Sequence, residues 1–332
     1  MKIIIISVHS LALHYLKESF NDGQLKKITL ITDKLTNELK KFIKLKNIKY
    51  LATKNLTIKS LDKIDLKNSV VFSAGSPWIF NEKLIKKFGK KFYNVHQSPL
   101  PSMKGSVAPY IIMYEIRSFQ VCLHKVTTGI DSGNVIYRKN IFIPSDLKTP
   151  LVINNFLQKK NREMLKEFIT KFEKKIRLNQ ETQNNFFSSY NTRLSSDING
   201  WIDWNYEVDD LDRFIRSFGE PYKGAKTFIN DKQVNIKFVE KSKQDAAKHP
   251  DEVGRVIRKF EDYIIVSVNS GSIYIKELTW KKRNIIDKIK SGDKFYTKTR
   301  YLDLKNRRAS FVSSNNKIYN QKTKLIKMET KS

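Results

Sequence analysis

Three polar side chains of this chain have the types and spacing that could carry out an acyl transfer. Asn94 and His96 alternate at the end of the apolar run 92–95, so in a strand both side chains lie on the same face. Asp131 follows the alternating run 121–126, in a loop with two glycines. A fixed amide or imidazole can stabilise negative charge on a carbonyl oxygen, and an imidazole or carboxylate can accept a proton from an attacking amine. The three residues therefore indicate transfer of an acyl group to an amine.

His96 taken alone would also fit a core histidine with a hydrogen-bond partner. A polar pair at the end of a buried strand is costly unless it is satisfied or used. The Asp131 loop favours a catalytic role, because a neighbouring carboxylate orients an imidazole and raises its basicity.

Three separated motifs around these residues resemble one family of enzymes. The motifs are N-V-H-x-S-x-L-P at 94–101, K-G-x-x-A-P at 104–109 and G-I-D-S-G at 129–133. In order and spacing they are similar to the formyltransferases that use 10-formyltetrahydrofolate. That family includes methionyl-tRNA formyltransferases, glycinamide ribonucleotide transformylase and the N-formyltransferases of nucleotide-linked amino sugars. The resemblance implies that Asn94, His96 and Asp131 are the catalytic residues.

A second stretch resembles the C-terminal part of the same family. It consists of Gly-Trp-Ile-Asp-Trp at 200–204 followed by residues 213–227, and the family pattern is I-D-W…I-R-A-F…P-Y-P-G-A. Members with a longer C-terminal region carry this pattern, so it speaks against the purine-pathway branch. Lys223 departs from the pattern, since the family has a second proline there.

The resemblance also implies a pocket for the pterin of 10-formyltetrahydrofolate, the expected co-substrate. Backbone amides and carbonyls are expected to do most of the recognition there. The expected folate-binding residues are Phe72, Gly75, Ser76, Trp78, Ile79, Leu100, Thr128, Gly129 and Ile130. Trp78 would fit an ordinary core or turn aromatic equally well.

Two acceptors fit the family: a nucleotide-linked amino sugar and the amino group of methionyl-tRNA. The tRNA-modifying members have a longer basic loop after the first strand, and the stretch 7–12 has no such opening, which favours the sugar nucleotide. The segment 218–225 also resembles the sugar-modifying members more closely. The expected acceptor-binding residues are Met103, Lys104, Gly105, Tyr222 and Lys223, of which the two lysines could neutralise a diphosphate or be ordinary solvated lysines.

The net charge of +30 keeps the tRNA alternative open, because phosphate groups attract basic proteins. Most of the 63 basic residues are lysines spread along the whole chain, whereas a dedicated phosphate-binding surface would be rich in arginine. We therefore expect mainly solvated lysines, with an anionic small molecule or RNA as the alternative explanations. A protein that only senses folate or RNA, with Asn94 and His96 in structural roles, is the non-enzymatic alternative.

The elements that must position these residues alternate along the first half of the chain. Strands are expected at 2–6, 27–32, 70–73 and 92–95, with helical patterns up to residue 20 and at 34–46, 81–88 and 151–175. This alternation predicts an α/β fold with a doubly wound, mostly parallel sheet. The resemblance implies that this sheet is the Rossmann-like core of the formyltransferases. Ligands of such sheets bind at the carboxyl ends of the strands, where the loops after Ser73 and Val95 begin.

The second half of the chain predicts a smaller, β-rich domain. Residues 208–218 have helical spacing of apolar residues, and short alternating runs follow from 225 to 278. We therefore assign 1–178 to the catalytic domain, 179–205 to a polar linker and 206–332 to a β-rich C-terminal domain with a basic tail. The C-terminal domain could also build a homodimer interface.

The lone Cys122 excludes a disulfide framework and a zinc site built from several cysteines. No metal site is expected, because no metal-ligand spacing occurs. No apolar run approaches the roughly 20 residues that span a bilayer, so no membrane partner is expected either. The run 3–6 is too short for a signal peptide, and together these features predict a cytoplasmic enzyme.

Overall fold

The computed structural model describes residues 2–176, 178–307, 311–312 and 318–319. The chain forms two compact units built from alternating segments: Met1–Gly105, Ser118–Phe142 and Asn155–Tyr190 in the first, and Ser106–Arg117, Ile143–Asn154 and Asn191–Ser332 in the second. The predicted bounds of 1–178, 179–205 and 206–332 differ from this division. Two short segments of the predicted catalytic domain join the second unit, and part of the predicted linker belongs to the first. Of the predicted basic tail after Trp280, residues 308–310, 313–317 and 320–332 lie outside the described residues.

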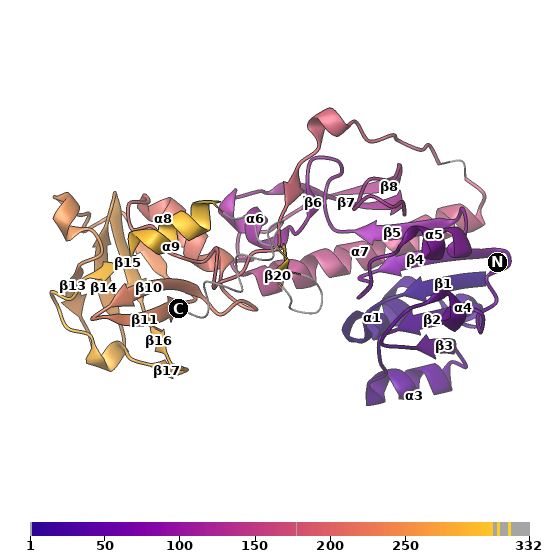
Figure 1. Cartoon of the computed structure of the whole chain (residues 1–332), viewed down its shortest axis with the longest axis horizontal. Helices are drawn as coiled ribbons and strands as arrows, with labels where there is room; N and C mark the ends of the chain where they lie inside the picture. The colour runs from indigo at the N-terminus through magenta and orange to yellow at the C-terminus, as the bar shows by residue number, and fades with distance from the viewer. Residues whose placement is uncertain (1, 177, 308–310, 313–317, 320–332) are drawn as a thin grey trace. The chain divides into compact units, whose positions relative to one another are not determined.

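The first unit contains a seven-stranded sheet in the order β3-β2-β1-β4-β5-β7-β8 (Figure 1). Its strands are β1 (Lys2–Ile6), β2 (Ile28–Thr32), β3 (Lys49–Ala52), β4 (Ser69–Ala74), β5 (Phe92–His96), β7 (Ser118–Lys125) and β8 (Val135–Phe142). Strands β1 to β5 are parallel, and β7 pairs antiparallel with both β5 and β8. The predicted mostly parallel α/β sheet is therefore confirmed, with two antiparallel strands at one edge.

Helices cover both faces of this sheet, which makes it doubly wound. They are α1 (His9–Ser19), α2 (Asp22–Leu25), α3 (Asn37–Leu45), α4 (Ile58–Leu61), α5 (Glu82–Phe88) and most of α7 (Pro150–Glu173). On one face, Phe88 of α5 packs in a cluster with Ile4 and Ile6 of β1. On the other, Phe168 of α7 packs edge-on against Phe72 of β4, with 5.9 Å between the ring centroids. Continuous apolar runs along the central strands, such as Ile3–Ile6, thus bury side chains on both faces of the sheet.

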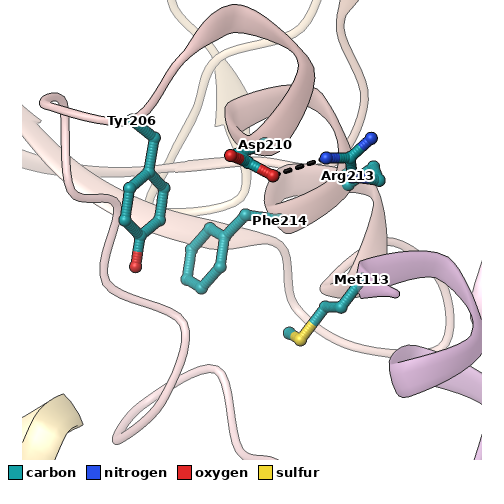
Figure 2. A pocket seen from close by; sticks show the side chains of 5 residues that line it. All are labelled: Met113, Tyr206, Asp210, Arg213 and Phe214. Atoms are coloured by element: carbon teal, nitrogen blue, oxygen red, sulfur yellow. Dashed lines mark hydrogen bonds and ion pairs between the residues drawn. The ribbon is translucent and has the colours of Figure 1, made fainter. Parts of the chain in front are cut away.

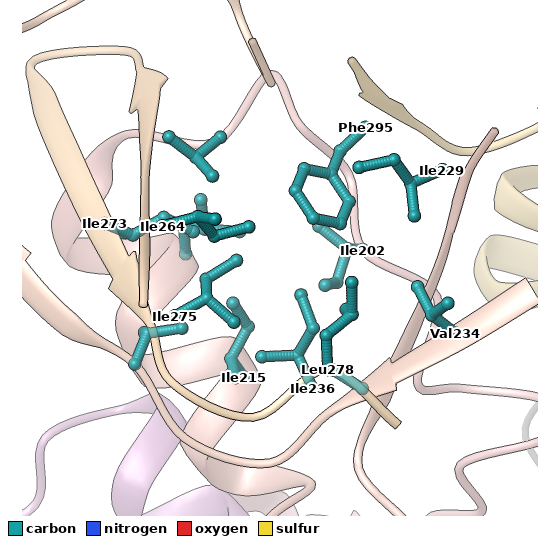
Figure 3. Packing of buried hydrophobic residues seen from close by; sticks show 14 of the residues in the cluster. Ile202, Ile215, Ile229, Val234, Ile236, Ile264, Ile273, Ile275, Leu278 and Phe295 are labelled. Atoms are coloured by element: carbon teal, nitrogen blue, oxygen red, sulfur yellow. The ribbon is translucent and has the colours of Figure 1, made fainter. Parts of the chain in front are cut away.

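The second unit is β-rich and has two larger sheets, in the orders β17-β16-β11-β10-β18 and β12-β15-β14-β13. Its longer strands are β10 (Ala225–Ile229), β11 (Lys232–Ile236), β13 (Val256–Lys259), β14 (Ile264–Val268) and β15 (Gly271–Ile275), and its helices are α6 (Ala108–Met113), α8 (Val208–Ser217) and α9 (Thr299–Arg307). Apolar side chains from α8 and from both sheets form one core (Figure 3). Ile215 of α8, Ile236 of β11 and Ile275 of β15 all belong to it, and each is fully buried. The predicted β-rich C-terminal part is therefore confirmed.

The remaining elements are short. They are β6 (Lys104–Gly105), β9 (Tyr190–Asn191), β12 (Glu240–Ser242), β16 (Thr279–Trp280), β17 (Arg283–Asn284), β18 (Phe295–Tyr296), β19 (Phe311–Val312) and β20 (Ile318–Tyr319), with the 3-10 helices η1 (Asn185–Phe187), η2 (Pro250–Glu252) and η3 (Ile286–Lys288). Across the described ranges, no helix combines the length and the apolarity that crossing a bilayer requires.

Candidate active site

Polar residues of the first unit gather where β5 pairs with β7. In this antiparallel register Asn94 lies opposite His124, and His96 lies opposite Cys122. Directly opposed residues share one face of a sheet, so the alternation along both strands brings these side chains together. β5 ends at His96, and β7 leads into the loop that carries Asp131.

The three predicted catalytic residues meet in this corner, together with His124. Nδ2 of Asn94 lies 3.1 Å from Nε2 of His124. Oδ1 of Asp131 lies 3.6 Å from Nδ1 of His96 and 3.5 Å from Nε2 of His124, which are ion-pair rather than hydrogen-bond distances. The two imidazole rings stand nearly perpendicular, with 5.8 Å between their centroids. One carboxylate oxygen therefore lies near both imidazoles, and the His124 ring lies between it and the Asn94 amide.

His124 is a residue of the site that the sequence analysis missed. Its Nδ1 lies 2.8 Å from the carbonyl oxygen of Lys125. Since a carbonyl only accepts and an amide nitrogen only donates, Nδ1 of His124 carries the hydrogen and Nε2 accepts from the amide of Asn94. This fixes the amide orientation, and the second hydrogen of Nδ2 can donate to a ligand oxygen. The sequence signal was present, because His124 alternates with Cys122 in the strand that leads to Asp131.

The imidazole of His96 is buried, and its Nε2 atom is the part of the site best placed to bind a ligand. The residue is 8% exposed, and its Nε2 has no hydrogen-bond partner among the described residues. Burial lowers the pKa of His96 below its ordinary value, against the opposing effects of Asp131 and the Met103 backbone, so the ring is neutral at neutral pH. A buried nitrogen of this kind is ready to exchange a hydrogen bond or a proton with a ligand.

Asp131 is ionised despite its burial. Burial opposes ionisation, but the rings of His96 and His124 and the backbone amide of Gly105 hold the pKa of Asp131 well below its ordinary value. The Gly105 amide donates to Oδ2 at 3.2 Å. The backbone of Asp131 is left-handed, with φ of 49°, which is uncommon for a residue other than glycine. The site thus combines a neutral imidazole with a nearby carboxylate held in an unusual loop conformation.

The predicted acceptor-binding residues divide between the two units. Met103, Lys104 and Gly105 belong to the first unit. The carbonyl of Met103 accepts a hydrogen bond from Ser98, and the Lys104 side chain is largely buried.

Tyr222 and Lys223 belong to the second unit, where no catalytic candidate lies. Burial raises the pKa of the Tyr222 hydroxyl. Lys223 is 75% exposed, with its Nζ 3.6 Å from Asp197.

Two of the predicted folate-binding residues prove to be core residues. Phe72 is fully buried between Tyr93 and Phe168, and Leu100 is buried against Cys122 and Val135. The prediction assigns most of the folate recognition to backbone groups, so it stays a prediction for these two residues, whose side chains belong to the core. Burial also raises the pKa of the Cys122 thiol to about 12, so this cysteine is unreactive.

The other predicted folate-binding residues lie in the surface loops that follow β4 and β7. Gly75 has φ of 70°, and a Cβ atom there would lie 2.6 Å from the Leu11 side chain, so glycine is favoured at this position. Trp78 is partly buried and donates from its indole nitrogen to the carbonyl of Lys54 at 3.1 Å, and its amide donates to Ser76 at 3.0 Å. The exposed members of the set are Ile79, Thr128, Gly129 and Ile130.

The same corner offers a set of metal ligands. His96, His124 and Asp131 each provide one ligand atom, and these atoms lie within 4.8 Å of one another. Two imidazoles and one carboxylate are a donor set that divalent transition metals accept. This arrangement was not predicted from the sequence, where the three residues are separated by 27 and 6 intervening positions along the chain.

A separate pocket of about 180 Å³ belongs to the second unit (Figure 2). It is lined by Met113, Tyr206, Asp210, Arg213 and Phe214, none of which was a predicted site residue. Asp210 and Arg213 form an ion pair at its edge.

Lys305 of α9 lies beside this pocket, on the rings of two residues that line it. Its ammonium group is 4.6 Å from the ring centroid of Tyr206 and 4.3 Å from that of Phe214. Burial lowers the pKa of Lys305 to about 8. These contacts hold α9 against α8 and the segment before it.

Comparison with known proteins supports the same interpretation of both halves of the chain. Residues 195–291 match the family described as formyl transferase, C-terminal domain. The chain is 27% identical over 67% of its length to the bifunctional polymyxin resistance protein ArnA of Wigglesworthia glossinidia brevipalpis, of which the match spans 33%. It is 25% identical over 60% of its length to methionyl-tRNA formyltransferase of Marinobacter nauticus, of which the match spans 63%. The chain thus spans between one third and two thirds of the length of these curated relatives.

The fold also resembles that of a solved N-formyltransferase from Helicobacter canadensis, whose structure contains folinic acid and dTDP-3-aminofucose. The match has a TM-score of 0.62 at 22% identity and covers 84% of this chain and 100% of that one. The fold is therefore that of the formyltransferases, and the resemblance predicted from the sequence motifs is confirmed.

Proposed function

We propose that this chain, which has the formyltransferase fold and carries a formyl transferase C-terminal domain, transfers a formyl group from 10-formyltetrahydrofolate to the primary amine of a nucleotide-linked amino sugar. The observation that carries the proposal is the meeting of Asn94, His96 and Asp131 at the corner of β5 and β7. These are the amide, imidazole and carboxylate that the motifs single out for transfer of an acyl group to an amine.

The chemistry assigned to each residue follows from the geometry. The amine nitrogen of the acceptor forms a bond to the formyl carbon, and the bond from that carbon to the folate nitrogen breaks. The carbonyl oxygen becomes negatively charged in between, and Nδ2 of Asn94 donates to it, a contribution of about 3–4 kcal/mol for one such donor. The amine gives up a proton, and the folate nitrogen gains one as it leaves. His96, with its free Nε2 and with Asp131 on its other side, relays that proton.

One structural observation indicates that the residues of the site suit a folate co-substrate. Nε2 of His96 is a buried polar atom to which no described residue hydrogen-bonds, and a polar ligand would supply a partner. The loops with Gly75 to Ile79 and with Thr128 to Ile130 would hold the pterin, largely through their backbone groups. Phe72 and Leu100 would contribute backbone groups only, since their side chains belong to the core.

A sugar nucleotide is the acceptor that we favour. The relative from Helicobacter canadensis was solved with a dTDP-linked amino sugar and matches over the whole of its length. The stretch 7–12 also runs directly from β1 into α1, without a long basic loop. The largely buried Lys104 could pair with a phosphate of such an acceptor. Lys223 and Tyr222 stay acceptor-binding candidates within the second unit.

Methionyl-tRNA is the alternative acceptor, and two observations favour it. The curated relative from Marinobacter nauticus is a methionyl-tRNA formyltransferase, and the net charge of +30 would attract tRNA phosphates. Under either acceptor the proposed location is the cytoplasm, and a homodimer built by the C-terminal domain stays part of the proposal.

An acceptor panel tests this function. The purified full-length chain is incubated with 10-formyltetrahydrofolate and, in separate reactions, dTDP- or UDP-linked amino sugars and initiator methionyl-tRNA, and products are identified by mass spectrometry. Formylation of an amino sugar, with none of the tRNA, is the expected result. Formylation of the tRNA alone would replace the acceptor while leaving the chemistry, and no formylation of any amine would refute the function.

A further inference from the structure

The segment 181–189, predicted to be part of a linker, is bound along the candidate site at several points. We call it the strap. At its start, the backbone amides of Glu181 and Val135 each donate to the other residue's carbonyl, at 2.8 and 2.9 Å. The carboxylate of Glu181 also accepts two hydrogen bonds from Arg138, both of 2.8 Å. The strap is thus fixed to β8, directly after the loop that carries Asp131.

The end of the strap is attached to the loop that precedes β6. The Ser189 amide donates to the carbonyl of Pro101 at 3.3 Å, and the Lys104 amide donates to the carbonyl of Ser189 at 2.9 Å. The Ser189 hydroxyl donates to the carbonyl of Ser102. The strap therefore links the loop of Asp131 to the loop that carries the predicted acceptor residues 103–105.

Between these attachments, a single side chain of the strap turns inward. Gln183 is buried, whereas its neighbours Thr182 and Asn184 are exposed. Its Nε2 donates to the carbonyl of Asp131 at 2.9 Å and to the carbonyl of Gly133 at 2.7 Å. Both hydrogens of the amide are thus used on the backbone of the Asp131 loop.

Asp131 needs such support for two reasons. Its backbone is in the left-handed region, which costs energy for a residue with a Cβ and persists only where the surroundings hold it. Its carboxylate stands 3.6 Å from His96 and 3.5 Å from His124, so a small shift of the loop would change both distances. The Gly105 amide restrains the carboxylate itself, and Gln183 restrains the backbone that carries it.

We propose that Gln183 is a positioning residue, which holds Asp131 in register with the two imidazoles through its paired hydrogen bonds to the loop. This inference rests on the proposed function, because it assigns to Gln183 an effect on the turnover that Asp131 supports. Gln183 touches no reacting atom in this account. Its role is to keep the carboxylate where it orients His96.

Three variants of Gln183 and one matched control test the inference. Gln183→Ala removes both hydrogen bonds, and Thr182→Ala removes an exposed side chain from the same strap. We expect Gln183→Ala to lower kcat by about 100-fold, the scale of effect of a misplacement near 1 Å, with little change in either KM. Gln183→Asn keeps the amide but is one methylene too short, so it should resemble Gln183→Ala. A kcat of Gln183→Ala equal to that of Thr182→Ala would overturn the inference.

The isosteric Gln183→Glu variant supplies a readout that a purely structural role would not move. Its buried carboxyl group faces two carbonyl oxygens, so its pKa should rise, and only the protonated form can donate a hydrogen bond. We expect the kcat of Gln183→Glu, divided by that of Gln183→Ala at the same pH, to rise as the pH is lowered. A ratio that does not depend on pH would contradict the hydrogen-bonding role.

Failure of this inference can be told apart from failure of the proposed function. If Asp131→Ala loses turnover and Gln183→Ala does not, the positioning role is wrong and the function stands. If the native chain transfers no formyl group, NMR titration of the imidazoles tests the positioning role of Gln183 instead. Gln183→Ala should then lower the pKa of His96 further, because the carboxylate that favours its protonated form is displaced, and Thr182→Ala should not. Unchanged titrations in both variants would overturn the inference.

Discussion

At the residue scale, the candidate site depends on a buried imidazole with one nitrogen facing a carboxylate and the other not hydrogen-bonded to any residue that the structure describes. His96 has this arrangement, and Asn94 and His124 complete the hydrogen bonding beside it. The types and the roles of Asn94, His96 and Asp131 could be proposed from the sequence, because their motifs are local. His124 was missed because its place depends on which residue of β7 lies opposite Asn94, and that register is set by pairing between distant segments.

Substitution of the three candidate catalytic residues should separate chemistry from folding. We expect Asn94→Ala to lower kcat by about 100- to 1000-fold, because one fixed donor to the developing negative charge is lost. His96→Ala and Asp131→Ala should each lower kcat by orders of magnitude. Their thermal unfolding midpoints should stay close to that of the native chain. His14→Ala is a matched control at an exposed histidine of α1 and should leave kcat unchanged. Near-normal turnover of the His96 variant would end its assignment.

The lowered pKa of His96 predicts how stability depends on pH. Below the ordinary pKa of 6.5, His96 binds a proton in the unfolded chain but stays neutral in the native protein. The free energy of unfolding therefore decreases as the pH falls. Asp131, whose native pKa is also lowered, acts in the same direction below its ordinary value of 3.8. In urea titrations, His96→Gln should show a weaker decline than the native chain just below pH 6.5. Identical pH profiles would contradict the lowered pKa.

Metal removal tests the alternative use of the same three ligand atoms. The proposed chemistry assigns His96 and Asp131 to proton transfer, so treatment with EDTA and dialysis should leave kcat unchanged. Metal content is measured in the same samples. A loss of turnover that Zn²⁺ or another divalent metal restores would instead assign His96, His124 and Asp131 to a metal site.

At the element scale, the loop between β7 and β8 decides where Asp131 lies. Its strands could be anticipated in part, since residues 121–126 alternate, but β8 and the reversed direction of β7 were not predicted. The strap was predicted as linker because its polar residues carry no periodicity. Its attachment to the site arises from hydrogen bonds of Gln183 and Glu181 to residues about 50 positions earlier, which no local pattern reveals.

Gly133 tests the close packing of this loop. A Cβ atom at Gly133 would lie 2.0 Å from the carbonyl oxygen of Lys125, the same oxygen that accepts from the His124 ring. Gly133→Ala should therefore force the backbone apart, lower the free energy of unfolding by about 1–3 kcal/mol and reduce kcat. Gly23→Ala is the control, since a Cβ atom there meets its nearest neighbour at 3.4 Å. Equal stability and activity of the two variants would contradict the packing.

At the scale of the whole molecule, the sequence indicated a parallel α/β half and a β-rich half, and both were found. The division between them was not predictable from local patterns. Residues 106–117 lie between two strands of the first unit in the sequence, yet their helix α6 packs against α8 in the second. Such assignments depend on which apolar faces meet across more than 90 residues, whereas α6 itself shows only a short apolar run after Pro109.

The central claim is that Asn94, His96 and Asp131 surround one formyl carbon, and a structure of the ternary complex tests it most directly. The chain would be crystallised with 5-formyltetrahydrofolate, a stable analogue of the donor, and a dTDP-linked amino sugar. We expect the formyl group at the corner of β5 and β7, with its oxygen within hydrogen-bonding distance of Nδ2 of Asn94 or Nε2 of His96, and the sugar amine facing its carbon. A folate bound with its formyl group away from these three side chains would contradict the account.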